Sequence, residues 1–179
     1  MLTGRDRAGG ASVASVPIPP FVEDLRRHVG HALLWLPGVT AVVRRGAGPD
    51  TEVLLVRRAD DGTWTPVTGI VDPGEEPAVA AAREALEEAD VTIRVDRLAR
   101  VGVTDEVAYP NGDRSVYLDL TFACTWLAGE ARVADDESTD VRWCAPGDLD
   151  DVDPPLAAHM RARIDAALAD EVAARFATG

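Results

Sequence analysis

The spacing of hydrophobic and polar residues predicts distinct helices and strands along the chain. In residues 21–29 the apolar side chains recur at helical spacing, with charged residues between them, which predicts a short amphipathic helix. Two strand-like runs follow at residues 33–45 and 51–58, and we expect a turn at Pro37-Gly38 within the first run. The turn residues at 46–50 would let the two strands pair as a hairpin.

The second half of the chain has more strands and then a helix. Residues 91–109 and 115–127 are strand-like on either side of Asn111-Gly112, which predicts a hairpin with its tip at residues 110–113. A short strand is expected at residues 140–144. Residues 154–176 read as a C-terminal helix with an apolar stripe at Leu156, Met160, Ile164 and Leu168. We expect that stripe to pack on the sheet, and a homodimer contact is the alternative.

Residues 69–91 combine a loop and a helix in a pattern that local propensity does not explain. Pro77 suits the first helical position, and strong helix formers fill residues 78–89. One side of a helical wheel holds Val79, Ala82, Leu86 and Ala89. The other side holds Glu84, Glu87 and Glu88, which we expect to converge without a basic partner and to repel one another. Such a face is often only a solvated surface, but carboxylates also suit Mg2+, which bridges readily to substrate phosphates.

The charged positions in this segment resemble the Nudix box. That motif is G, five residues, E, seven residues, then R-E-U-x-E-E-x-G-U, where U is a bulky aliphatic residue. Gly69, Glu75 and the run REALEEADV at residues 83–91 occupy its positions. Ala85 is smaller than the usual residue, and Asp90 replaces glycine at a helix end, where Asp tolerates left-handed backbone better than most residues do. The preceding loop is similar to a W-x-P-x-G-G approach, with Thr68 in place of a glycine and Trp64 expected to pack beneath it.

The resemblance to the Nudix hydrolases implies an α+β fold, an α/β/α sandwich around a mixed β-sheet. It implies metal-dependent hydrolysis, with Mg2+ or Mn2+, of a diphosphate linkage in a nucleoside diphosphate derivative. ADP-ribose and oxidised nucleoside triphosphates are both candidate substrates. The alternative is a Nudix-fold domain that binds or senses a nucleotide without hydrolysing it, although such proteins usually lack some of the box glutamates.

Carried over to this sequence, the resemblance assigns the metal to Glu84, Glu87 and Glu88, with the Gly69 carbonyl as a further ligand. Glu75 and Arg83 would have a structural role, as an ion pair that locks the loop to the helix. A general base is also needed, and it comes either from the box or from a later loop.

Three residues outside the box are candidates on weaker grounds. Glu137 lies just ahead of the strand at residues 140–144 and is our candidate base, with a solvated acidic loop as the alternative. Arg57 and Arg58 end the strand that leads to the box. They would contact substrate phosphate, or else one would face solvent and the other pair with a carboxylate.

Composition limits the other functions. The 179 residues fit one domain at residues 21–179, after a flexible tail rich in Gly, Ser, Ala and Pro at residues 1–20. A net charge of −13 without a basic patch argues against a nucleic-acid polymer as partner. The absence of a long apolar run or a signal-peptide core argues against a membrane and favours a cytoplasmic location.

The cysteines and two of the histidines lack the spacing of a metal site. Cys124 and Cys144 lie in strand-like runs, so we expect buried free thiols. We expect no acidic or cysteine partner around His28 and His31, and therefore surface or capping roles for both.

Overall fold

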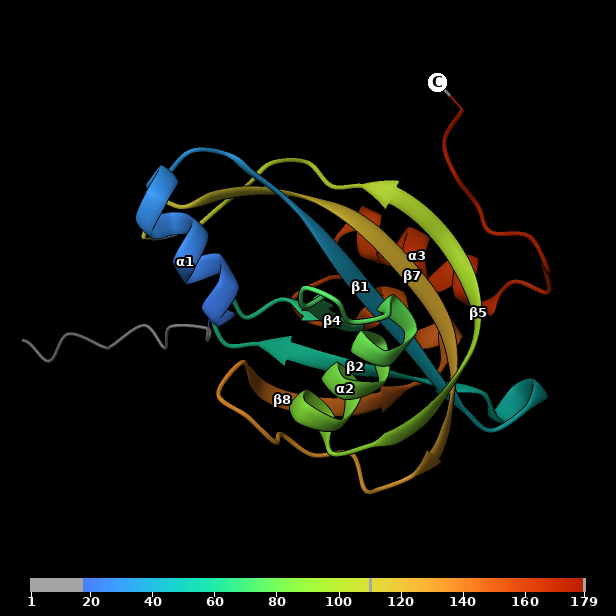
Figure 1. Cartoon of the computed structure of the whole chain (residues 1–179). Helices are drawn as coiled ribbons and strands as arrows, with labels where there is room; N and C mark the ends of the chain where they lie inside the picture. The colour runs from blue at the N-terminus through green and yellow to red at the C-terminus, as the bar shows by residue number, and fades with distance from the viewer. Residues whose placement is uncertain (1–17, 110, 179) are drawn as a thin grey trace, which may run out of the picture.

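A central mixed sheet with helices on both faces forms the molecule, as seen in a computed structural model that describes residues 18–109 and 111–178 (Figure 1). The helices are α1 (Pro20–Val29), α2 (Pro77–Ala89) and α3 (Ala158–Leu168), with short 3-10 helices at Gly48–Asp50 and Pro146–Asp151. The strands are β1 (Leu34–Arg45), β2 (Glu52–Arg58), β3 (Trp64–Thr65), β4 (Val67–Ile70), β5 (Thr92–Val103), β6 (Val107–Ala108), β7 (Arg114–Ala128) and β8 (Ser138–Cys144).

Strand β1 runs through the centre of the sheet. It pairs in parallel with β7 from Leu34 to Arg44, and antiparallel with β4 along one part and with β2 at its end. The predicted β1–β2 hairpin is therefore confirmed. The predicted turn at Pro37-Gly38 is wrong, because the strand continues through both residues. The Pro37 carbonyl accepts a hydrogen bond from Val71 N (3.2 Å). Pro37 has no N–H to donate, but it lies just beyond the residues of β1 that pair with β4, so a proline is tolerated there.

The two faces of the sheet bury different cores. Val39, Ala41 and Val43 of β1 pack with the alanines of α2, whereas Val42 packs on the opposite face with Ile164 of α3. Figure 1 shows α2 in front of the sheet and α3 behind it. This alternation confirms the expected α/β/α arrangement around a mixed sheet, because successive strand side chains point to opposite faces.

Helix α2 begins at Pro77 as predicted but buries a different face. Its buried residues are Ala80, Ala81, Ala85, Glu88 and Ala89. Val79 and Leu86, which share one side of the helical wheel with Ala89, are 57% and 52% exposed, whereas Ala89 is buried. Small alanines let the helix approach β4 closely, and this rotation turns Glu84 and Glu88 toward the sheet instead of toward solvent.

The C-terminal helix is shorter than predicted. The Pro154-Pro155 pair keeps the chain out of helical conformation, and α3 begins only at Ala158. At its other end Ala169 is extended, and the tail then pairs with β5 through Arg175 N to Ala99 O (2.8 Å). Ile164 is buried and Leu168 packs against the same core, so the apolar stripe is covered by the molecule's own sheet and no longer argues for a homodimer.

The hairpin around Asn111-Gly112 is present, with β5 and β6 antiparallel to β7. Cys124 and Cys144 are buried free thiols, as expected. Most of the predicted flexible tail, residues 1–17, lies outside the described residues. No helix among the described residues is both long and apolar enough to cross a membrane.

Candidate active site

The loop between β4 and α2 is tied to the helix by the predicted ion pair. Arg83 Nε and Nη2 donate to the two carboxylate oxygens of Glu75, each at 2.9 Å. Arg83 Nη2 also donates to the Ile70 carbonyl at 3.1 Å, and Glu75 accepts a hydrogen bond from Asp72 N at 3.2 Å. The hydrogen bonds from Arg83 lower the pKa of Glu75, although burial opposes them. The pair therefore fixes the loop between β4 and α2, and the hydrogen bond to Ile70 fixes the end of β4 next to Gly69.

Arg83 also contacts two of the three box glutamates. Its Nη1 donates to Glu84 Oε1 at 2.8 Å and to Glu87 Oε2 at 2.9 Å. The expectation that these carboxylates lack a basic partner is wrong, because neighbouring helical positions bring Arg83 between them. The hydrogen bonds of Arg83 do not extend to Glu88.

Glu84 lies directly against Gly69. A side chain at position 69 would place its Cβ 2.0 Å from the Glu84 Cδ atom, so only glycine leaves room for that carboxylate. Burial raises the pKa of Glu84 to about 7, and the charges of Glu137 and Glu87 add to this while Arg83 opposes it. The structure thus brings two of the proposed oxygen ligands, the Glu84 carboxylate and the backbone of Gly69, side by side.

Glu88 is the most deeply buried of the box glutamates, with 3% of its surface exposed. Burial raises the pKa of its carboxyl well above the usual range, and the nearby charges of Glu84 and Glu137 raise it further, while Arg58 opposes the shift. The charges of three carboxylates, Glu84 and Glu88 on α2 and Glu137 in the loop before β8, therefore act on one another.

Glu137 lies near the glutamates of α2 because backbone hydrogen bonds hold its loop to α2 and to the residue after β2. Ala134 N donates to the Glu88 carbonyl at the end of α2 (3.2 Å), and Ala59 N donates to the Glu137 carbonyl (2.8 Å). Burial, with help from the charge of Asp135, raises the pKa of Glu137 to about 7. A carboxylate in this environment is a stronger proton acceptor than an exposed one.

The two arginines that end β2 have different surroundings. Arg58 forms a two-pronged ion pair with Asp60 at 2.5 and 2.9 Å, and its charge acts on both Glu88 and Glu137. Arg57 points to the other side of the strand, where its Nε donates to the Gly62 carbonyl at 3.0 Å. Of the two, Arg58 is the one that faces the carboxylates.

The donor atoms suit a hard divalent cation. Glu84, Glu88 and Glu137 supply carboxylate oxygens and Gly69 supplies a carbonyl, which is the ligand chemistry that Mg2+ prefers. Among the described residues no three such side chains already lie at the spacing of a complete metal site. The fit rests on three carboxylates that repel one another, of which Glu88 is buried and Glu84 and Glu137 are partly buried, and Glu84 is held by Arg83 in this structure.

Trp64 packs beneath its loop, with its Nε1 donating to the Asp153 carbonyl at 3.0 Å, as expected. The expectation that His31 lacks an acidic partner is wrong, since His31 Nδ1 lies 2.9 Å from Asp113 Oδ1. The hairpin brings these residues together from distant parts of the chain, so sequence spacing carries no signal of their contact.

Comparisons with known proteins agree with this geometry. The family model of the NUDIX domain matches residues 35–167, and the chain therefore belongs to the Nudix family. It is 35% identical over 100 residues to a MutT-like protein of Streptomyces ambofaciens, covering 56% of this chain and 59% of that protein. It is 28% identical over 144 residues to the NAD-capped RNA hydrolase NudC of Deinococcus radiodurans, covering 79% of this chain and 49% of that protein.

A solved structure supports the fold. The MutT NUDIX hydrolase from Burkholderia pseudomallei superposes with a TM-score of 0.55 at 28% identity, covering 74% of this chain and 97% of that one. The chain spans only about half to six tenths of the length of the two curated relatives, as their 49% and 59% coverage shows.

Proposed function

We propose that this chain, as a single domain over residues 21–179, hydrolyses a diphosphate linkage in a nucleoside diphosphate derivative with the help of Mg2+ or Mn2+. The observation that carries the proposal is the contact of the Glu84 carboxylate with Gly69, together with the charges of Glu88 and Glu137 that act on Glu84 and on each other. Glu88 is buried, and Glu84 and Glu137 are partly buried. Mutually repelling carboxylates that are withdrawn from water without enough basic partners destabilise a fold, so their retention together favours a cation-binding role.

Glu84, Glu88 and the Gly69 carbonyl would hold the metal. Glu87 would join them only after leaving Arg83, because its carboxylate is paired there and largely exposed. A bound divalent ion would neutralise charge on the diphosphate oxygens and lower the pKa of the attacking water. The Glu75–Arg83 pair keeps the loop and helix in register, so that the ligands from β4 and α2 stay together.

The remaining chemistry is assigned to residues outside the helix. In hydrolysis, the water oxygen forms a bond to one phosphorus, the bridging P–O bond breaks, and the other phosphate leaves with the bridging oxygen. Glu137 would accept the proton that the water loses. Arg58 would contact a phosphate oxygen, exchanging part of its pairing with Asp60. Arg57 has no such path, since it lies on the opposite side of β2.

The substrate class follows from chemistry that the candidates share. The relative from D. radiodurans is named for NAD-capped RNA, and NAD contains a diphosphate between two nucleosides. ADP-ribose contains the same linkage, and oxidised nucleoside triphosphates contain a related one. The competing function is nucleotide binding without turnover, and the presence of every box glutamate favours hydrolysis over it.

Turnover of ADP-ribose and 8-oxo-dGTP with Mg2+, with identification of the products, tests this proposal. Glu137→Gln should lower kcat by roughly 10² to 10⁴, the usual worth of a positioned acid–base group, with little change in apparent Mg2+ affinity. Glu88→Gln should weaken apparent Mg2+ affinity, with partial recovery at high Mg2+. Glu23→Gln, on the exposed side of α1, is the matched control and should keep wild-type kinetics.

Two results would overturn the proposal. Full activity in excess chelator would exclude the metal role. Tight nucleotide binding without hydrolysis of either compound would instead support the sensor function.

A further inference from the structure

A buried ion pair lies on the face of the sheet that α3 covers. The Arg163 side chain on α3 and the Asp119 side chain on β7 are 6% and 4% exposed, and Arg163 Nε lies 3.3 Å from Asp119 Oδ2. The same carboxylate accepts hydrogen bonds from the hydroxyl groups of Thr40 and Thr121, each at 2.7 Å. Thr40 follows Val39, whose side chain packs toward α2. Because successive strand side chains alternate between the faces, this network lies on the other face of the sheet from the box glutamates.

The partners of Arg163 satisfy only part of its guanidinium group. Its Nη1 donates to Thr40 Oγ1 at 3.0 Å and contacts Met160 Sδ at 3.4 Å. Its Nε is buried and makes no hydrogen bond, since the nearby Asp119 oxygen lies outside hydrogen-bonding geometry, and Nη2 has no partner among the described residues. A guanidinium group carries five N–H donors, and leaving some of them unpaired in a buried position costs free energy. The unused donors therefore favour the binding of a further acceptor.

A second guanidinium group lies beside this pair. Gly102 of β5 is the direct ladder partner of Asp119, so the two positions share one face of the sheet. Arg100 covers Gly102 on that face, because a Cβ at position 102 would lie 2.4 Å from Arg100 Nη1. In the part of the chain that the structure describes, Arg100 forms no ion pair and no side-chain hydrogen bond. Two guanidinium groups thus flank one buried carboxylate, which leaves one positive charge in excess.

Further positive potential gathers around Arg163. Burial lowers the pKa of Arg163, and the charge of Arg100 adds to that shift while Asp119 opposes it. His159 precedes Arg163 by four residues, so both side chains project from one side of α3. The charge of the exposed Asp105 acts in the opposite sense on His159. No side chain caps the N-terminus of α3, whose free N–H groups form the positive end of the helix dipole.

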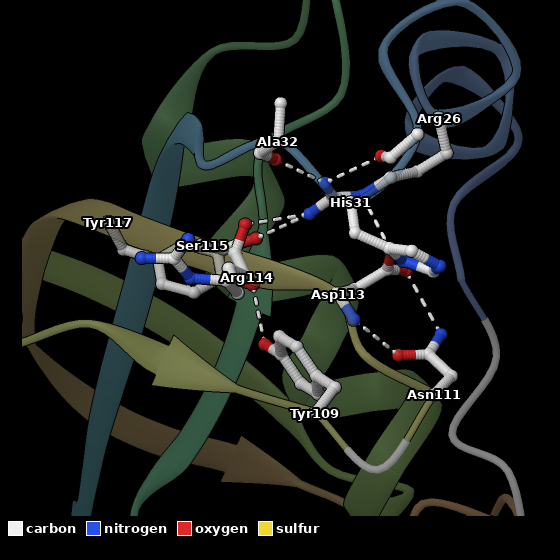
Figure 2. Close-up of polar contacts among 10 residues, drawn as sticks. Arg26, His31, Ala32, Tyr109, Asn111, Asp113, Arg114, Ser115 and Tyr117 are labelled. Carbon is white, nitrogen blue, oxygen red and sulfur yellow. Dashed lines mark hydrogen bonds and ion pairs between the residues drawn. The ribbon is translucent and has the colours of Figure 1, made fainter.

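An aromatic ring and an opening to solvent border the two arginines. Tyr117 precedes Asp119 by two residues on β7 and projects from the same face of the sheet. The Tyr109 and Tyr117 hydroxyl oxygens lie 2.6 Å apart, which holds the Tyr117 ring in one orientation (Figure 2). Arg100 and Gly102 are only partly buried, so this face is open to solvent on the side of β5.

We propose that Arg100 and Arg163 bind a phosphate group, free or as a monoester, on the α3 face of the sheet. Planar guanidinium groups match the oxygens of a phosphate, and each can donate two N–H bonds to it. In a chain with a net charge of −13, a phosphate needs such a local excess of positive charge in order to bind without a metal. The inference goes beyond the proposed function, because it requires neither a metal nor hydrolysis.

Calorimetric titration with inorganic phosphate in excess chelator, at constant ionic strength, tests this site. The chelator removes divalent metal, so phosphate cannot bind through a cation held by the box glutamates. The wild-type chain should show saturable binding. Arg100→Met, which keeps much of the side-chain length over Gly102, should weaken the phosphate affinity by roughly ten- to a hundredfold, the worth of hydrogen bonds from a charged group.

Arg44→Met is the matched control for the loss of one positive charge. Arg44 is exposed near the end of β1, forms no ion pair with any described residue, and should leave the phosphate affinity unchanged when replaced. A second variant combines Arg163→Met with Asp119→Asn and so removes both charges of the buried pair, which avoids leaving one buried charge unpaired. It should weaken phosphate binding at least as much as Arg100→Met does.

A wild-type chain without saturable phosphate binding would overturn the inference, and so would equal phosphate affinities in Arg100→Met and Arg44→Met. Ribose 5-phosphate that binds more tightly than inorganic phosphate would identify a monoester as the ligand, whereas equal binding would identify the free ion. The two proposals fail separately. Phosphate binding in chelator without any Mg2+-dependent hydrolysis removes only the proposed function, and hydrolysis without phosphate binding in chelator removes only the inference.

Discussion

Gly69 shows how one missing side chain decides the geometry of the site. Its extended position in β4, opposite Val39, does not itself require glycine. The requirement comes from Glu84, whose carboxylate occupies the volume where a Cβ would stand. The glycine of the box is therefore needed for close approach of a functional group rather than for backbone freedom.

Gly69→Ala should displace Glu84 from β4, because a contact of 2.0 Å cannot be accommodated without movement. We expect weaker apparent Mg2+ affinity and a lower kcat/KM for the best substrate, with far-UV circular dichroism unchanged. Gly147→Ala is the matched control, since a Cβ there meets nothing within 4 Å. Equal Mg2+ affinity in Gly69→Ala and the wild-type chain would remove Glu84 from the proposed ligand set.

The C-terminal end of helix α3 is capped by a side chain from another element. Arg97 of β5 donates through Nη2 to the carbonyl oxygens of Ala166 (2.9 Å) and Ala169 (2.7 Å). Carbonyls at a helix C-terminus lack partners within the helix, and a cation there also complements the helix dipole. The cap thus links α3 to β5, a strand at the edge of the sheet.

Arg97→Met keeps the length of the side chain and removes the cap, and it should lower the free energy of unfolding by about 1–3 kcal/mol. Amide hydrogen exchange should speed up in the last turn of α3. Arg94→Met, on the same strand, removes a largely exposed pair with Asp96 and should change the free energy of unfolding by less than about 1 kcal/mol. Similar losses in both variants would contradict a specific capping role.

At the scale of the whole molecule, the proposed metal site joins three segments that are distant in the chain. The ligand candidates come from β4 and α2, and Glu137 comes from the loop before β8. A cation that binds this arrangement and not the unfolded chain stabilises the fold by mass action, by about 2.7 kcal/mol at a concentration one hundred times its Kd.

Mg2+ should therefore raise the melting temperature, and a chelator should reverse the rise. Glu88→Gln should hold or raise the melting temperature without metal, because it removes a buried charge, and should lose most of the response to Mg2+. Glu87→Gln should lose less of that response, since its carboxylate is more exposed and is paired with Arg83. A Glu88→Gln variant with the full response would exclude Glu88 as a ligand.

The sequence by itself determined the features that depend on local chemistry. Pro77 fixed the start of α2, and Asp90 adopts the left-handed backbone expected of it at the helix end, with φ 53°. The Glu75–Arg83 pair followed from the resemblance of this segment to the Nudix box, and both of its residues belong to one loop–helix unit. Fold class followed as well, since the box came with a strand order that admits few arrangements.

Only the tertiary structure decided which groups meet across the chain. The buried face of α2 depends on how closely alanines approach β4, and the helical wheel, which groups the exposed Val79 and Leu86 with the buried Ala89, does not show that face. The position of Glu137 depends on backbone hydrogen bonds to α2 and to the end of β2, and the ion pair of Arg26 with Asp113 depends on where the hairpin tip lies. Such contacts arise from packing between segments far apart in sequence, so neither residue spacing nor local propensity encodes them.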